Sequence, residues 1–275
     1  MSPGSSPTRN TKYLAGGHSF IPAGKADKRS PCPALNALAN HGYIPREGTY
    51  ISFLHLLRAV QNVYNLTLPL ALLLTLVGFL TCAKVSFKLP EPPSFSIRSR
   101  PHPGLCRGYR WRFSCSWTLD LADLSARGWT KITHDASLVH PSGTASHAPD
   151  PGLLRSLLHA DITELDSAPL QENGMTLRDL ATVRVTREKS LPHPLSSFHE
   201  QVAVGECALG WLVMRDADTG AIAVDTLAQW FGEERLPEGW WHSRRPSRPV
   251  GLWQARKRAG QVEVFMTQIR ATDVC

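Results

Sequence analysis

The most informative part of the sequence is SPCPALNALANHGYIPREG, from Ser30 to Gly48. Its middle part, residues 34–41, has a helical pattern, and a glycine followed closely by a proline is typical of a helix end. Cys32 directly precedes this helix, and Pro33 takes the first helical position, which proline favours. The sequence therefore predicts that the sulfur of Cys32 lies at the N-terminus of a helix.

A cysteine in this position has several chemical uses. The free N–H groups and the positive end of the helix dipole favour the thiolate and lower the pKa of the thiol. Such a thiolate serves as a nucleophile, a redox centre or a metal ligand. A buried structural cysteine is the more common alternative. The stretch alone leaves all four interpretations open.

The composition fits an ordinary globular chain. Of 275 residues, 42% are hydrophobic and 19% are charged, which excludes a coiled coil and wholesale disorder. Six cysteines are too few for a disulfide scaffold. The net charge is +7, and residues 85–115 contribute six basic side chains and a single acidic one. A charge run of this kind predicts a solvated loop, and we expect no nucleic-acid partner.

Apolar spacing along the chain predicts a mainly α, single-domain fold with long loops. The longest apolar run, residues 66–82, is short for a membrane span, so we expect a central buried helix and no stable span. Strand signals are weak, and residues 261–269 are the best candidate. The predicted helices cover residues 34–41, 51–65, 66–82, 119–126, 151–158, 176–189, 201–214 and 224–231.

Two further clusters carry candidate chemistry. His134 and Asp135 are adjacent, and a carboxylate beside an imidazole can fix its tautomer to form an acid–base pair. A polar turn is the alternative there. Glu206 lies within an apolar helical segment, where a carboxylate is costly unless it is paired or faces a cavity. An exposed polar stripe is the alternative in this case.

Taken together, these segments resemble one known family. Residues 30–48 closely resemble the signature of the fungal haem-thiolate peroxidases, the chloroperoxidase and unspecific peroxygenase family. Residues 134–137 are similar to its Glu-His-Asp-x-Ser motif, Gly205 and Glu206 to its distal glutamate helix, and residues 234–240 to a C-terminal segment. The resemblance covers roughly residues 18–84 and 116–245.

The resemblance also implies a domain organisation. We expect a disordered tail at residues 1–17, a haem-thiolate peroxidase-like domain at 18–245 and a C-terminal extension at 246–275. The basic stretch 85–115 has no counterpart in the family pattern. It is interpreted either as a surface insertion or as a translated intron.

The family's chemistry implies a role for each matched residue. Cys32 would be the thiolate ligand of a haem b iron, steadied by the backbone N–H groups of Ala34 and Leu35. Glu206 would move the proton of hydrogen peroxide, and His134 with Asp135 would hold Glu206 in position. The implied reaction transfers oxygen to a small organic substrate or oxidises phenols or halide.

One departure concerns a structural metal ion. The family has a glutamate before the His-Asp pair, which binds Mg²⁺ or Mn²⁺ together with the residue matching Ser137 and a haem propionate. This chain has Thr133 there, and a neutral hydroxyl is a much poorer ligand for a hard divalent cation. We therefore expect weak or lost metal binding, with Ser137 as the retained candidate ligand.

Other interpretations stay open on the sequence. The first is a catalytically weakened haem-binding homologue, and the second is a hydrolase that uses Cys32 with His134 or His41 as base. Cys275 is either a free thiol or the link of a disulfide dimer. The first twenty residues contain no apolar signal segment, which favours an intracellular over a secreted protein.

Overall fold

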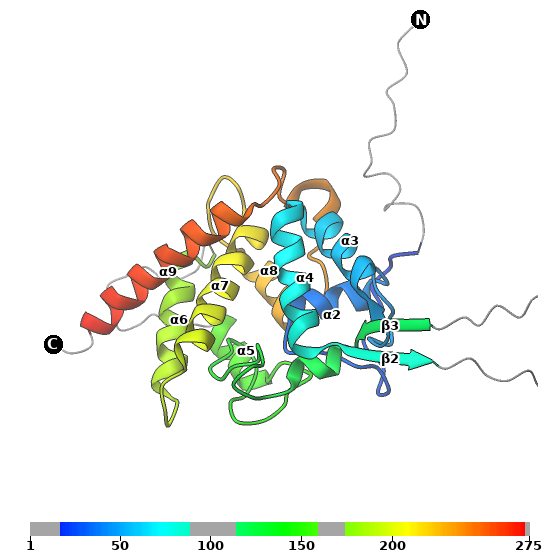
Figure 1. Ribbon diagram of the computed structural model, residues 1–275. Coiled ribbons are helices and arrows are strands. Elements are labelled where there is room, and N and C mark those ends of the chain that lie inside the picture. The colour runs from blue at the N-terminus through cyan, green and yellow to red at the C-terminus, as the bar shows by residue number, and fades with distance from the viewer. Residues whose placement is uncertain (1–16, 89–113, 159–173, 273–275) are drawn as a thin grey trace, which may run out of the picture.

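The computed structural model describes residues 17–88, 114–158 and 174–272. Cys275 and most of the N-terminal tail lie outside these ranges, as do residues 89–113 of the basic stretch. The described part is mainly α, as predicted, with a small sheet at one end (Figure 1). Its α-helices are α2 (Pro33–Asn40), α3 (Phe53–Tyr64), α4 (Leu68–Cys82), α5 (Pro151–Leu158), α6 (Leu177–Lys189), α7 (Ser197–Met214), α8 (Val224–Leu227) and α9 (Leu252–Thr272).

The helix α2 begins where the sequence predicts. Cys32 is its N-cap residue and Pro33 opens the first turn. The next helix, α3, starts at Phe53, because the preceding two residues pair as the short strand β1 (Ile51–Ser52). It ends at Asn65, whose φ of 53° lies in the left-handed region that stops a helix.

The sheet corrects the expectation that residues 85–115 are entirely a loop. The strands β2 (Lys84–Lys88) and β3 (Ser114–Leu119) are antiparallel, with Lys84 opposite Thr118, and the strand order is β1-β3-β2. The 3-10 turn η1 (Leu121–Ser125) follows β3, so the helix expected from residue 119 is shorter and starts later. Trp117 stacks on Phe53 with 5.7 Å between the ring centroids, which anchors the sheet to α3.

The strand expected at residues 261–269 is wrong, because this segment belongs to the long helix α9. The apolar side chains of α9 recur at the helical period rather than on alternate residues. Val262 and Met266 are buried, and Ala255 and Ile269 pack against the core on the same face. α9 therefore packs on α6 and α7 as part of the folded domain (Figure 1).

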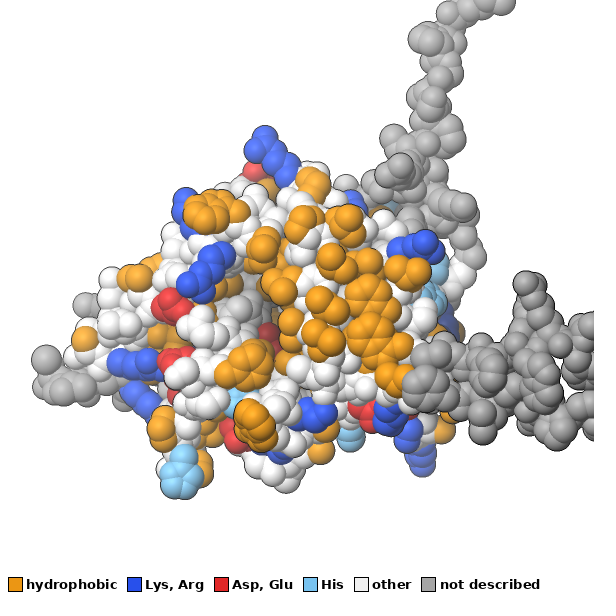
Figure 2. All heavy atoms as spheres, in the orientation of Figure 1, with side chains coloured by type: hydrophobic (Ala, Val, Ile, Leu, Met, Phe, Trp, Pro, Cys, Tyr) orange, Lys and Arg blue, Asp and Glu red, His pale blue; other side chains and the backbone are white. Residues whose placement is uncertain are grey.

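The central buried helix expected at residues 66–82 forms as α4, but it is buried on one face only. One face of α4 packs inward through Leu70, Ala71 and Phe79, but the opposite face is open, and Leu80 is 70% exposed. Figure 2 shows apolar side chains gathered over this part of the surface. No helix in the described ranges is both long and apolar enough to cross a membrane.

Further along the chain, α8 gives way to the π-helical turn η2 (Ala228–Gly232), and the π-helical turn η3 (Trp240–Arg244) follows. Trp230 and Trp240 from these turns pack edge-on against Tyr64 of α3. Tyr64 is itself buried beside α2. The last part of the domain therefore packs against its first helices.

Gly48, the last residue of the stretch 30–48, allows a close backbone contact. Gly48 has a φ of 69°, and a Cβ there would lie 2.1 Å from the carbonyl oxygen of Lys28. We expect Gly48→Ala to lower the free energy of unfolding by about 3 kcal/mol. Alanine is unfavourable at this positive φ, and the backbone at Lys28 must also move to make room for the Cβ. Urea denaturation measures this loss.

Gly143→Ala is the matched control. Gly143 also has a positive φ, 81°, but a Cβ there meets nothing within 4 Å. Gly143→Ala should lower the free energy of unfolding only by the cost of the left-handed conformation, about 1 kcal/mol. Equal losses in the two variants would show that the contact with Lys28 has no effect on stability.

Candidate functional site

One side of the candidate site is the N-terminus of α2. The backbone N–H groups of Leu35 and Ala34 hydrogen-bond to the sulfur of Cys32. Tyr64 donates its hydroxyl hydrogen to the carbonyl oxygen of Ala34 at 2.6 Å, which fixes this first turn. Burial nevertheless outweighs the two N–H groups and raises the pKa of Cys32 to about 11. The helix start does lower this pKa as expected, but burial raises it more, so the expected net lowering is wrong for the chain by itself.

A buried hydrogen-bond network holds this helix start in place. Asn36 accepts a hydrogen bond from the Ser30 backbone N–H at 2.9 Å and donates to the Ser30 carbonyl at 2.7 Å. The Ser30 hydroxyl oxygen accepts from the backbone N–H of Cys32 at 3.2 Å. Asn36 also donates to Glu234 Oε1 at 2.6 Å. The orientation of Cys32 is thus tied to a residue near the end of the domain.

The other side of the site is a histidine–glutamate pair. His134 lies in the loop after η1, and its Nε2 is 3.0 Å from Oε2 of Glu206 on α7. Burial lowers the pKa of His134, but the Glu206 carboxylate raises it more, and the net pKa lies above its ordinary value. Burial raises the pKa of Glu206, yet His134 and Arg184 lower it more. The two groups therefore form an ion pair.

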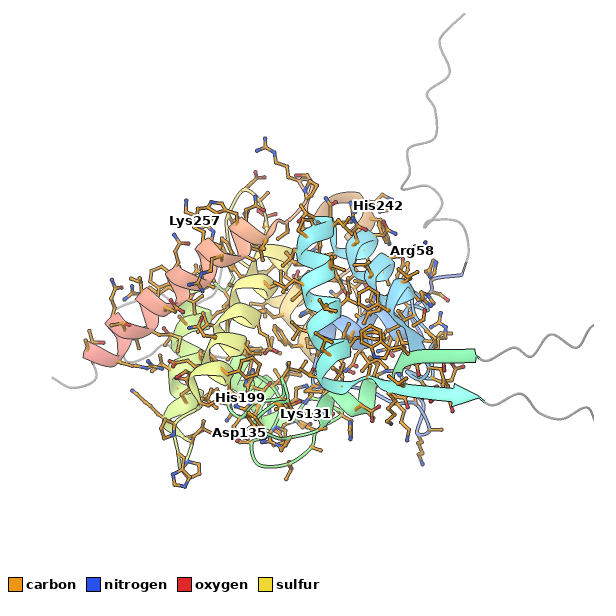
Figure 3. All side chains as sticks on the ribbon, viewed as in Figure 1. Arg58, Lys131, Asp135, His199, His242 and Lys257 are labelled. Atoms are coloured by element: carbon orange, nitrogen blue, oxygen red, sulfur yellow. The ribbon has the colours of Figure 1, made fainter. Side chains whose placement is uncertain are left out.

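The structure corrects the role expected for Asp135. Nδ1 of His134 is 2.7 Å from the backbone carbonyl oxygen of Asp135, so the backbone rather than the carboxylate orients the ring. The carboxylate instead accepts hydrogen bonds from Arg127 at 2.8 Å and from the Gly143 N–H at 2.6 Å. Asp135 lies near Lys131 and His199 on the same lower part of the molecule (Figure 3).

The side chain of Glu206 borders open space. The side chain of Glu206 is 64% exposed, although enough protein surrounds it for burial to affect its pKa. A Cβ at the adjacent Gly205 would meet no atom within 4 Å. Glu206 is also near enough for its charge to raise the pKa of Cys32. Figure 2 shows the surface hollowed between α7 and α4. Cys32 could hold a cofactor through its sulfur, within electrostatic reach of Glu206.

The described residues do not fit the metal site that the resemblance implies. The Thr133 hydroxyl donates to the Leu124 carbonyl oxygen, and the Asp135 carboxylate is already paired. The carbonyl oxygen of Ser137 accepts a hydrogen bond from Arg187. No group of three or more His, Cys, Asp or Glu side chains in the described ranges is arranged to hold a metal ion.

Sequence reasoning missed several residues that build this site. Glu234 and Asn36 support Cys32, and Arg184 and Arg187 of α6 bind the loop that carries His134. Each acts through a contact with a distant part of the chain, so no local spacing marks it. Two matched segments contain members of this set, since Asn36 lies within residues 30–48 and Glu234 begins the C-terminal segment, but neither segment indicates the contact between them.

The chain is similar to known peroxidases. It is 43% identical over 90 residues to an aromatic peroxidase of Fusarium equiseti, an alignment that covers 32% of this chain and 20% of the relative. It is 50% identical over 56 residues to a chloroperoxidase of Leptoxyphium fumago, covering 19% and 15% of the two chains. An aromatic peroxygenase of Cyclocybe aegerita is 44% identical over 48 residues, covering 18% and 13%. The chain thus aligns with a fifth or less of the length of these relatives.

A family model covers much more of the chain than these alignments do. The model described as peroxidase, family 2, matches residues 18–245, a range that contains Cys32, His134 and Glu206. It therefore includes both sides of the candidate site and most of the described helices. The chain belongs to peroxidase family 2, the haem-dependent fungal haem-thiolate peroxidases.

Proposed function

We propose that this chain is a hydrogen peroxide-dependent haem-thiolate peroxidase or peroxygenase that uses haem b. The observation that carries the proposal is a cysteine sulfur bonded by two helix N–H groups, with the Glu206–His134 pair near enough for the charge of Glu206 to affect that sulfur. Haem with a thiolate ligand favours cleavage of the peroxide O–O bond. Cys32 would hold the iron, and the N–H groups of Leu35 and Ala34 would stabilise the charge on its sulfur.

Glu206 is suited to move the peroxide proton. Its lowered pKa keeps the carboxylate ionised near neutral pH, so it can accept a proton from one peroxide oxygen. With haem bound, Glu206 would return that proton to the other peroxide oxygen, so that this oxygen could leave as water. His134 holds the carboxylate by the 3.0 Å contact and is itself held by the backbone of Asp135.

The surroundings of the hollow favour a small apolar organic substrate. Figure 2 shows apolar side chains on the α4 side of the hollow, and Leu72, Leu73 and Leu76 of α4 are all partly exposed. Apolar walls stabilise apolar ligands, whereas a halide ion gains little from them. We therefore favour oxygen transfer to, or oxidation of, an organic molecule over halide oxidation.

The geometry gives no support to a cysteine hydrolase. Both ring nitrogens of His41 are occupied, since Nδ1 contacts the His18 carbonyl at 2.9 Å and Nε2 accepts from the Leu236 N–H at 3.2 Å. His134 is paired with Glu206. With its pKa at about 11, the Cys32 thiol is also a poor nucleophile by itself.

The decisive experiment is the absorption spectrum of the reduced, carbon monoxide-treated protein after loading with haem. We expect a strongly red-shifted Soret band, which indicates thiolate ligation. Cys32→Ala should lose this band, because the ligand is removed. Cys82→Ala, which changes a buried free cysteine of α4, should keep it. A wild-type spectrum of the histidine type, or with no haem band at all, would refute the proposal.

Replacement of Glu206 tests the acid–base role. Glu206→Gln should retain haem and lower the rate of peroxide activation by about 10²–10⁴-fold, because an amide cannot accept the proton. Stopped-flow measurement with hydrogen peroxide gives this rate. Glu263→Gln, on α9 and bonded to Gln201 of α7, is the control and should react at the wild-type rate. Equal rates in all three proteins would remove Glu206 from the reaction.

The ion pair also predicts a pH dependence of stability. Its contribution is complete between the ordinary pKa values, 4.5 for glutamate and 6.5 for histidine. It is lost as the pH falls through the lowered pKa of Glu206 and as the pH rises through the raised pKa of His134. The Tm difference between wild type and Glu206→Gln should therefore peak within this window. A difference that does not change with pH would show that the pair is not ionised.

A further inference from the structure

Two arginines of α6 bind the backbone of the loop at residues 133–140. Arg184 Nη1 donates to the carbonyl oxygen of Ala136 at 2.6 Å. Arg187 donates from Nε to the carbonyl oxygen of Ser137 at 2.9 Å and from Nη2 to that of His140 at 3.2 Å. Three carbonyl oxygens of one short loop thus turn toward the positive charges of a single helix.

The charge of Arg184 is buried and compensated. Arg184 is 1% exposed, and a buried guanidinium is costly without a partner. Its Nε donates to Glu188 Oε1 at 2.8 Å, and the other oxygen of Glu188 is paired with Arg270 of α9. Arg270 also pairs with Glu200 of α7 at 3.2 Å. A chain of ion pairs through Glu188 and Arg270 thus links Arg184 of α6 to α9 and α7.

The loop needs such an external support. Ala136 has a φ of 58°, a left-handed conformation that costs a non-glycine residue about 1–2 kcal/mol. Carbonyl oxygens with a nearby carboxylate are the donors that hard divalent cations bind. Here guanidinium N–H groups already occupy the carbonyl oxygens, and position 133 supplies a hydroxyl that donates to Leu124.

We propose that Arg184 and Arg187 hold this loop in place of a divalent cation, so that the chain positions His134 without Mg²⁺ or Mn²⁺. The importance of His134 rests on the proposed function. The support of the loop does not, since it is measured on the purified full chain whether or not haem is bound.

The first test is the response of the wild-type protein to metal ions. A ligand at about 100 times its Kd raises the Tm of a domain of this size by several degrees. We expect the same Tm in EDTA and in about 1 mM MnCl₂ or MgCl₂, for the haem-loaded as well as the haem-free chain, since the loop has no site for the ion. A rise of several degrees with either metal would overturn the proposal.

The second test is hydrogen exchange of the amides at residues 133–140 in variants of α6. Arg184→Gln and Arg187→Gln should each speed this exchange by about tenfold or more, because the loop opens locally more often. Arg155→Gln is the control, since this arginine is exposed and, among the described residues, bonds to the Pro151 carbonyl oxygen of its own helix. Unchanged exchange in both α6 variants would show that the arginines do not hold the loop.

A rescue experiment separates support by charge from a general loss of stability. Thr133→Glu combined with Arg187→Gln restores a carboxylate and frees a carbonyl oxygen, so Mn²⁺ should slow the loop exchange of this double variant but not of wild type. If Mn²⁺ does not slow hydrogen exchange in the double variant, a cation cannot replace the arginine, which would contradict the proposal. If Arg184→Gln fails to fold, the metal response and the Arg187 variants still decide the proposal. A wild type that binds no haem would refute the proposed function alone.

Discussion

The N-terminus of α2 is held by a hydrogen bond between two buried side chains, from Nδ2 of Asn36 to Oε1 of Glu234, at 2.6 Å. Burial raises the pKa of Glu234 to about 7, against the hydrogen bond from Asn36 and the nearby charge of Arg29. A buried carboxylate is costly, so the position of this residue is strongly constrained by these partners. Asn40 adds a bond to the Glu234 backbone carbonyl at 3.0 Å. Because Cys32 directly precedes α2, the direction of its sulfur depends on the same contacts.

This support also sets the electrostatic character of the sulfur. Burial raises the pKa of Cys32, and so do the negative charges of Glu206 and Glu234. Two N–H groups alone do not offset these effects, so the isolated chain holds a neutral thiol. A bound metal cation reverses this balance, since a coordinating thiol is deprotonated outright. The site is therefore arranged for a sulfur that is charged only together with a cation, which fits a haem-thiolate family better than a free nucleophile.

The sequence predicted what is local and missed what depends on distant partners. The helix start at Cys32 and Pro33 follows from capping chemistry within a few residues. The contact of His134 with Glu206 was anticipated through the family resemblance, because no spacing shows that positions 72 residues apart meet. The role of the Asp135 carboxylate was predicted wrongly, because adjacency in sequence to His134 does not make a side chain point toward the imidazole. Arg127 and the Gly143 N–H bind this carboxylate instead. The strand pairing of Lys84 with Thr118 was not predicted, because backbone pairing across a long insertion leaves little local signal.

The arginine support and the acid–base pair act on each other through charge. Arg184 lowers the pKa of both His134 and Glu206, so it opposes protonation of the imidazole and favours the ionised carboxylate. The carboxylate still raises the pKa of His134 above its ordinary value, and the ring therefore remains a donor to Glu206. A carboxylate that accepts this charged hydrogen bond is well oriented but less basic. The charges of Arg184 and His134 together thus affect how readily Glu206 takes a proton. The loop at residues 133–140 connects them, because it carries His134 and is bound by Arg184.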